Sequence, residues 1–280
     1  MRFRCRLKRF WSLGLALVLG LAVGLLWPAR SPAQIPRLFS LDRLQAHQIA
    51  NLSWADEKSL GRAIDARFKQ EGLLPYVGHD PALDVFVNRV LQSLVAVSTY
   101  PERLYTVQIV DDENVNAFAT LGGYVYLNTG LLKRIDNEAE LAGVLAHELG
   151  HLEERDGLNQ LWLQLTVQDL TLQADRRQQR LVAMAGDLRS LSNGHASEYT
   201  ADAIAFGILG RAGYSQFALV TLLQRIADNG VLEKPGFIST HPNPYRRIEQ
   251  LEYLLATEQT LEATAGLDST AYQQLIVSLP

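Results

Sequence analysis

Hydrophobic residues recur three and four positions apart over most of this chain, which is the spacing of amphipathic helices. Within Leu41–Leu73, the residues Leu60, Ile64 and Phe68 follow this spacing, and Asp80–Val97 repeats it. The same pattern predicts further helices over Leu158–Leu191, Ser197–Leu209, Ser215–Asp228 and Tyr245–Thr257. We therefore expect a predominantly helical protein.

A short stretch after the second predicted helix has the alternation that is typical of strands. Tyr105, Val107 and Ile109 alternate with polar residues, and a β-rich run covers Tyr124–Leu127. This pattern predicts two or three antiparallel strands that end near Asn128. The fold class is therefore α+β, with a small antiparallel sheet beside the helices.

The next helix is predicted from its capping residues. Asn137 can cap a helix that continues through Leu149, and Glu140 lies three residues later in a capping-box arrangement. This helix carries the residues with the clearest chemistry.

The first 33 residues differ from the rest of the chain. A basic stretch precedes the apolar run from Phe10 to Trp27, and Ser31 and Ala33 then supply the small residues of a signal-peptidase site. We expect cleavage after Ala33, a mature domain over residues 34–280, and export to the periplasm or cell envelope. The alternative is an uncleaved anchor that associates with the membrane through residues 10–27, because the run is slightly long for a signal core and slightly short for a span.

Charge and cysteine content narrow the function classes. The formal net charge is −4, and the leader holds six Lys and Arg residues and no acid, so the mature chain has a charge of −10. Such an acidic body argues against nucleic-acid binding. The only cysteine is Cys5 in the leader, so the mature chain has no disulfide framework.

The sequence His147-Glu148-Leu149-Gly150-His151 places two imidazoles four residues apart, on one face of the predicted helix. Two such nitrogens can bind one zinc ion. Glu148 directly follows the first histidine, so it points beside the metal, where a carboxylate can take a proton from the attacking water. Each histidine alone would more often be a surface or core residue, but the combined motif favours a catalytic metal site.

A third ligand is expected downstream, because catalytic zinc usually takes three protein ligands and keeps a fourth position for water. Glu198 and Asp202 lie four residues apart on a predicted helix, together with Ala201, Ala205 and Leu209 on a face that reads as buried. If Glu198 binds zinc, Asp202 can accept a hydrogen bond from the other ring nitrogen of a ligand histidine. A solvated pair of acids is the alternative, but burying two carboxylates without a cation is costly.

With these motifs, the chain resembles the HtpX/BepA-type gluzincins of peptidase family M48 over roughly Asp111–Ile248. The matching segments are Asn116-Ala-Phe-Ala119 with Gly122-Gly123, Gly130-Leu131-Leu132, His147-Glu-Leu-Gly-His151, Glu198-Tyr-Thr-Ala-Asp202, and Ser239-Thr-His-Pro242 with Arg247-Ile248. The resemblance implies a zincin-type fold and one zinc ion per chain with Glu198 as the third ligand. It also implies that Asn116, Ala117 and Phe118 form a strand edge that pairs with an extended peptide substrate.

The chain departs from parts of that family. HtpX-like members carry several membrane spans and BepA-like members add a C-terminal helical-repeat domain, whereas about thirty residues follow Ile248 here. The chain is therefore similar to the soluble exported branch without repeats. The resemblance implies a zinc-dependent endopeptidase acting on unfolded or misassembled envelope proteins. The alternative is a proteolytically inactive zinc-containing chaperone or binding module, against which the intact Glu148 argues.

His241 has three possible roles. In the family, a histidine in the Ser-x-His-Pro context lies near the active site, and Pro242 and Pro244 would keep its loop stiff. It could donate to the oxyanion that forms on the peptide carbonyl. It could instead occupy the fourth zinc position and keep the enzyme inactive, or it could be a loop residue without a role. His47, His79 and His195 have no matching context, and Arg247 could serve an anion or a buried carboxylate.

Overall fold

The structure is a computed structural model that describes residues 51–73, 75, 81–161, 194–228, 240–258, 263–277 and 279. The predicted leader over residues 1–33, its apolar segment 10–27, most of the helical pattern that starts at Leu158, and His47 and His79 lie outside the described residues. Within the described ranges, no helix is long and apolar enough to cross a membrane.

Three strands form a small mixed sheet. They are β1 (Thr106–Val110), β2 (Ala117–Thr120) and β3 (Tyr124–Asn128), in the order β1-β3-β2. Strands β2 and β3 are antiparallel, as predicted, but β1 runs parallel to β3, so the prediction of a wholly antiparallel sheet is wrong for this pair. The reason lies in the connections: the three-residue turn η3 (Leu121–Gly123) joins β2 and β3 as a hairpin, and β1 pairs with the far side of β3. Gly122 and Gly123 both have positive φ, which suits glycine in such a tight turn.

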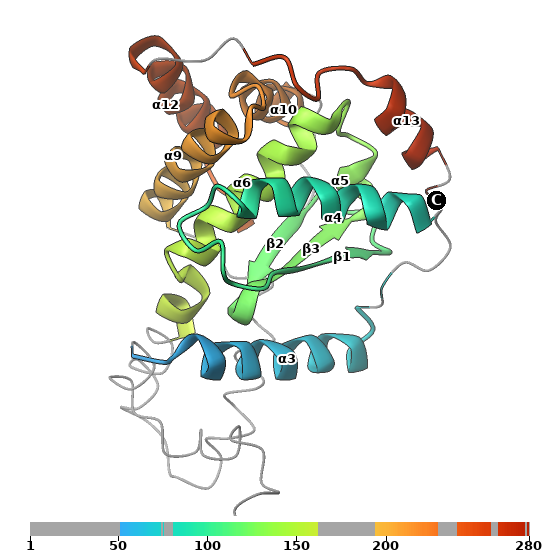
Figure 1. The fold of residues 1–280 in the computed structure, drawn as a ribbon, viewed down its shortest axis with the longest axis vertical. Coiled ribbons are helices and arrows are strands. Elements are labelled where there is room, and N and C mark those ends of the chain that lie inside the picture. The colour runs from blue at the N-terminus through green and yellow to red at the C-terminus, as the bar shows by residue number, and fades with distance from the viewer. Residues whose placement is uncertain are drawn as a thin grey trace, which may run out of the picture. The chain divides into compact units, whose positions relative to one another are not determined.

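Alternate residues of the strands face two different hydrophobic layers. Helix α3 (Trp54–Gln70) covers one face of the sheet, where Phe68 lies against Phe118 and Tyr126. Helices α4 (Pro81–Val95) and α6 (Glu138–Glu153) belong to the larger core on the other face, with Val125 and Leu127 (Figure 1). The predicted buried face of α3 is confirmed, and its start is fixed by Ser53, whose hydroxyl accepts from the Asp56 amide.

Helix α6 is the central helix of the larger core. Asn137 caps it by accepting a hydrogen bond from the Glu140 amide at 3.0 Å, as predicted. The Glu140 carboxylate, however, accepts from the Asp136 amide at 2.8 Å. Its charge is balanced by Arg225 of α10 (Phe217–Asp228). These contacts fix the N-terminal end of α6 and leave its C-terminal half to carry the metal motif.

Helix α9 (His195–Ala212) packs closely against α6, and α12 (Pro244–Thr257) packs against both α9 and α10 (Figure 1). These helices match the predicted elements to within a few residues. The close approach depends on Gly150, because a Cβ there would lie only 2.8 Å from the Cα of Ala201.

The C-terminal tail, for which the sequence predicted no structure, folds back onto the body. Its helix α13 (Thr270–Ile276) buries Tyr272, whose hydroxyl donates to the carbonyl of Leu132 in α5 (Thr129–Leu132) at 2.7 Å. The Ala139 amide also donates to the carbonyl of Gly266 at 2.9 Å. The tail therefore buttresses the start of α6.

Candidate metal centre

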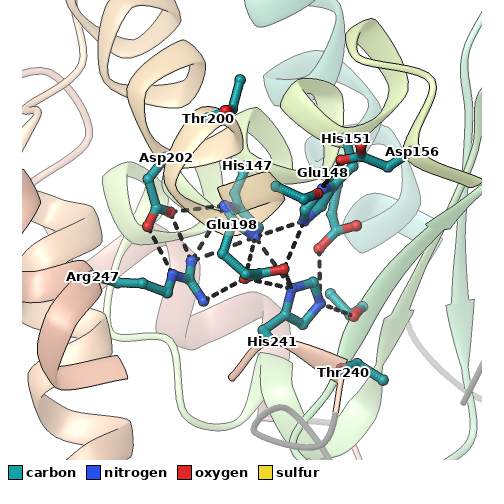
Figure 2. A network of polar contacts seen from close by, with 12 residues as sticks. His147, Glu148, His151, Asp156, Glu198, Thr200, Asp202, Thr240, His241 and Arg247 are labelled. Carbon is teal, nitrogen blue, oxygen red and sulfur yellow. Dashed lines mark hydrogen bonds and ion pairs between the residues drawn. The ribbon is translucent and has the colours of Figure 1, made fainter. Parts of the chain in front are cut away.

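Four buried side chains from three segments converge at the C-terminal half of α6. His147 and His151 come from α6, Glu198 from the first turn of α9, and His241 from the segment that precedes α12 (Figure 2). Each is at most 5% exposed. The 3.6-residue helical period accounts for the two histidines, whereas Glu198 and His241 are brought in by the packing of α9 and of the α12 segment.

The donor atoms of these four side chains all lie within 4.8 Å of one another, and five of the six pairs are close to the spacing of a tetrahedral zinc site. The His147 Nε2 atom lies 3.1 Å from His151 Nε2, 3.2 Å from His241 Nδ1 and 3.5 Å from Glu198 Oε2. Glu198 oxygens lie 3.3 Å from His151 Nε2 and 3.2 Å from His241 Nδ1. Ligands held about 2.0–2.2 Å from one tetrahedral ion are roughly 3.3–3.6 Å from each other. The residues present therefore fit a zinc ion.

The buried ion pair between Asp202 and Arg247 contacts the Nδ1 side of the His147 ring. The His147 Nδ1 atom lies 2.9 Å from Asp202 Oδ1, and Arg247 donates to both Asp202 oxygens at 2.7 Å. Arg247 also reaches Glu198 Oε2 at 3.0 Å. Burial raises the pKa of Asp202, but the charge and hydrogen bonds of Arg247, together with those of His147, outweigh burial and leave this pKa below its ordinary value. Asp202 is therefore an anion that orients His147, and Arg247 is its counterion.

His151 has a different carboxylate partner, which the sequence did not identify. Its Nδ1 atom lies 2.7 Å from Asp156 Oδ2, and the Ser197 hydroxyl donates to the same oxygen at 2.5 Å. Burial lowers the pKa of His151, while Asp156 and Glu198 raise it, to about 10 overall. Asp156 lies five residues after His151 and beyond the end of α6. The spacing rules for helices therefore did not identify it as a partner of His151.

The surroundings of Glu148 differ from those of Glu198 and Asp202. Glu148 is fully buried, and neither carboxylate oxygen has a hydrogen-bond partner among the described residues. The His241 Nε2 atom lies 3.5 Å from Glu148 Oε1. A buried carboxylate without hydrogen bonds is costly unless a ligand or cation completes its surroundings.

His241 also contacts the strand edge next to the site. Its Nε2 atom lies 3.1 Å from the Ala117 carbonyl oxygen, and the neighbouring Thr240 hydroxyl donates to Asn116 Oδ1 at 3.0 Å. Because the Asn128 amide donates to the Asn116 carbonyl, the backbone groups of Ala117 alternate away from β3 and face the open edge of β2. With its proton on Nε2, His241 therefore directs the Nδ1 lone pair at the other three side chains.

A cleft extends from the centre along β2. Its lining includes Phe118 and Leu121 beside the strand, Leu152 from α6, and Arg155 with Glu57 at the far end. The cleft therefore places an open strand edge, an apolar wall and the buried histidines next to one another. His195, which had no predicted role, is exposed at the start of α9.

A helix with two histidines at i and i+4, an intervening glutamate, and a further glutamate from a later helix together define the gluzincin class of metallopeptidases. Comparison with known sequences gives the same class and a family within it. The sequence model of peptidase family M48 matches residues 81–255, which is more than half of the chain. The chain belongs to peptidase family M48, and the predictions of family, fold class and metallopeptidase enzyme class are confirmed.

Among its curated relatives is the beta-barrel assembly-enhancing protease of Yersinia pestis, 30% identical over 71% of this chain and 44% of the relative. The protein of the same name from Escherichia coli K12 is 28% identical over 61% of this chain and 38% of the relative. The mitochondrial metalloendopeptidase OMA1 of Schizosaccharomyces pombe is 29% identical over 65% of this chain and 56% of the relative. The chain therefore spans roughly half or less of the length of these relatives.

Proposed function

We propose that this protein is a zinc-dependent endopeptidase in which His147, His151 and Glu198 hold one metal ion and Glu148 is the general base. The observation that carries this proposal is the Glu148 carboxylate, fully buried beside the histidines with no hydrogen bond to either oxygen in the described residues. A purely structural zinc site does not require a carboxylate in that position. A general base does, because it must be free to accept a proton.

Each residue around the metal site has a different role in the proposed reaction. A bound zinc ion would polarise the scissile carbonyl and acidify the attacking water. Glu148 takes the proton from that water and can pass it to the leaving amine. Asp202 holds the ring of His147 in one orientation, and Arg247 keeps Asp202 ionised.

The open edge of β2 is the proposed binding site for the substrate backbone. The outward backbone groups of Ala117 can pair with an extended peptide, while Asn116 and Phe118 of the same segment contribute their side chains to the site. Pairing through backbone groups favours extended, unfolded segments over compact folded ones. It also requires His241 to leave the Ala117 carbonyl.

We further propose that the substrates are unfolded or misassembled proteins of the cell envelope. Two kinds of observation support this: relatives are named beta-barrel assembly-enhancing proteases, and residues 1–33 have the pattern of a signal peptide. The protein would then act in the periplasm or at the membrane surface, anchored through residues 10–27 if the leader is kept.

The alternative function is an inactive zinc-containing chaperone or binding module. It is favoured by His241, whose Nδ1 atom lies 3.2 Å from both His147 Nε2 and Glu198 Oε2 and could close the site permanently. The same position is compatible with an enzyme whose His241 is a reversible fourth ligand. The two functions differ only in whether His241 can leave.

Zinc content and casein digestion, measured on the wild-type protein and on Glu148→Gln, test the proposal. The wild type should hold about one zinc ion per chain and digest casein. Glu148→Gln should keep the zinc and lose at least about 10²–10⁴-fold in turnover, because an amide cannot take the proton. Zinc without digestion in the wild type would favour the chaperone, and near wild-type turnover in Glu148→Gln would assign the base elsewhere.

A further inference from the structure

We propose that Asp156 is a positioning residue that fixes His151 and the first turn of α9 relative to each other. It thereby sets the separation of two ligands, His151 and Glu198, that come from different helices. This inference rests on the proposed zinc site, and concerns how the chain builds that site.

A single oxygen atom makes the connection. Asp156 Oδ2 lies 2.7 Å from His151 Nδ1 and accepts the Ser197 hydroxyl at 2.5 Å. Ser197 directly precedes Glu198. The Asp156 carboxylate therefore links His151, one proposed ligand, to the residue next to Glu198, another proposed ligand. A negative charge near the first turn of a helix is also favoured by the helix dipole. Figure 2 shows Asp156 beside His151, at the end of the site opposite Arg247.

The backbone conformation at Arg155 turns the chain so that Asp156 lies back toward His151. Arg155 follows the end of α6 with a φ of 57°, a left-handed conformation that non-glycine residues adopt at a cost. Its side chain offsets that cost, because it donates to the buried Glu57 at 2.9 and 3.0 Å and to the Leu52 carbonyl at 2.7 Å. The turn therefore reverses the chain at a defined point, and Asp156 is the next residue.

Asp156 also differs from Asp202 in a way that makes it testable. Asp202 is completely buried and accepts two hydrogen bonds from the buried Arg247, so its removal would take away the main counterion of a buried cation and destabilise the whole fold. Asp156 has a side chain that is 14% exposed and a neutral hydroxyl as its second partner. Its removal therefore disturbs the metal site without taking the counterion from a buried arginine, and Glu198 still contacts His151.

The test measures metal binding as well as activity. Zinc dissociation constants from chelator competition, and the visible absorption spectrum of the cobalt-substituted protein, are compared for Asp156→Asn, Ser197→Ala, Ser197→Thr and the Asp156→Asn/Ser197→Ala double variant. Thr200→Ala is the matched control, because the Thr200 hydroxyl lies on the same helix but donates only to the Ala196 carbonyl. Unfolding temperatures of the metal-free variants report any purely structural effect.

We expect Asp156→Asn to weaken zinc binding by about 10- to 100-fold and to change the cobalt spectrum. Ser197→Ala should weaken binding less, Ser197→Thr should restore it, and Thr200→Ala should leave it unchanged. The double variant should bind zinc as Asp156→Asn does, because the hydroxyl acts only through the carboxylate.

Unchanged zinc affinity and an unchanged cobalt spectrum in Asp156→Asn, with only the metal-free unfolding temperature lowered, would overturn the inference and leave Asp156 as a structural contact. Additive effects of the two substitutions would overturn it as well. A wild-type protein that binds no zinc would instead refute the proposed function itself, so the two failures are distinguishable.

Discussion

Glu148 and Glu198 are buried carboxylates beside the same histidines, yet their partners differ. Glu198 is contacted by Arg247 and by three histidines, and its pKa lies below the ordinary value, because these partners outweigh the raising effect of burial. Glu148 has no hydrogen-bond partner among the described residues. A carboxylate that is held by several donors suits a ligand, and one that is not held suits a base, so the environments separate the two proposed roles.

His241→Ala distinguishes the proposed roles of the fourth side chain. We expect peptidase activity or self-cleavage to rise, because the Nδ1 atom of His241 faces the proposed ligand atoms and its Nε2 atom contacts the proposed substrate-pairing edge at Ala117. His195→Ala is the matched control, since His195 is exposed on α9. The measurement is the rate of casein digestion together with the appearance of self-cleaved fragments.

Other outcomes of that substitution have defined meanings. A fall in turnover of about 10²–10³-fold would make His241 an oxyanion donor, and unchanged behaviour would leave it without a role. A zinc-loaded structure of the resting protein gives an independent check. The fourth-ligand role requires the His241 Nδ1 atom about 2.0–2.1 Å from the metal.

At the scale of elements, the site depends on how closely α6 and α9 approach. Gly150 lies inside the metal motif and faces Ala201, one helical turn along α9 from the proposed ligand Glu198. Glycine at this position lowers the helix propensity of α6, but it allows the two ligand-bearing helices to touch.

Gly150→Ala should therefore weaken zinc binding and destabilise the fold by about 1–3 kcal/mol, the usual cost of overpacking. The added Cβ would lie 2.8 Å from both the Cα and the carbonyl oxygen of Ala201, and backbone cannot move aside as a side chain can. Gly207→Ala on α9 is the control, because its Cβ would meet only the end of the Arg211 side chain. Chelator competition and denaturant unfolding measure both effects, and equal behaviour of the two variants would contradict the argument.

Helices α4 and α6 are also joined by an ion pair that predicts a pH dependence. Arg89 of α4 donates to Glu138 of α6 at 2.8 and 3.0 Å, and the Tyr214 hydroxyl donates to the same carboxylate at 2.6 Å. Burial raises the pKa of Glu138, but these donors outweigh it, so the pKa lies below its ordinary value of 4.5. The stabilisation is thus complete above the unfolded-state pKa and is lost as pH falls through the folded-state pKa.

The free energy of unfolding of wild type and Glu138→Gln should therefore differ at pH 7 and converge as the pH falls from the ordinary pKa of 4.5 through the lower folded-state pKa. Urea unfolding at a series of pH values measures this difference. A difference that stays constant down to pH 3 would mean that the charge of Glu138 does not stabilise the fold.

At the scale of the whole molecule, the metal centre contains more buried carboxylates than Arg247 alone balances. Glu148, Glu198 and Asp202 are each completely buried, and Arg247 is the buried arginine among them. Burying carboxylates is costly without compensating cations. A divalent ion at this point would therefore stabilise the fold as well as serve catalysis.

Removal of zinc should lower the unfolding temperature of the wild-type protein. A ligand that binds only the folded state at a free concentration of 100 times its dissociation constant stabilises by about 2.7 kcal/mol. Thermal unfolding with zinc and with a chelator measures the shift. Glu148→Gln should keep it and His147→Ala should lose it, while an equal shift in all three would point to zinc bound elsewhere.

The local pattern of the sequence by itself determined α3, α4, α6, α9, α10 and α12, their buried faces and the helical part of the site. The period of 3.6 residues places His147 and His151 on one face of a helix, and also Glu198 and Asp202, before any tertiary contact is known. The capping of α6 by Asn137 is a contact across three residues and was predictable for the same reason.

Only the tertiary structure decided the features that depend on contacts between distant residues. The parallel pairing of β1 with β3, the return of α13 to Leu132 and the contact between Asp156 and Ser197 each join segments with no shared periodicity. Arg247 and His241 reach the centre across about one hundred residues from His147. Periodicity fixes which residues share a face of one element, but the packing of different elements decides which faces meet.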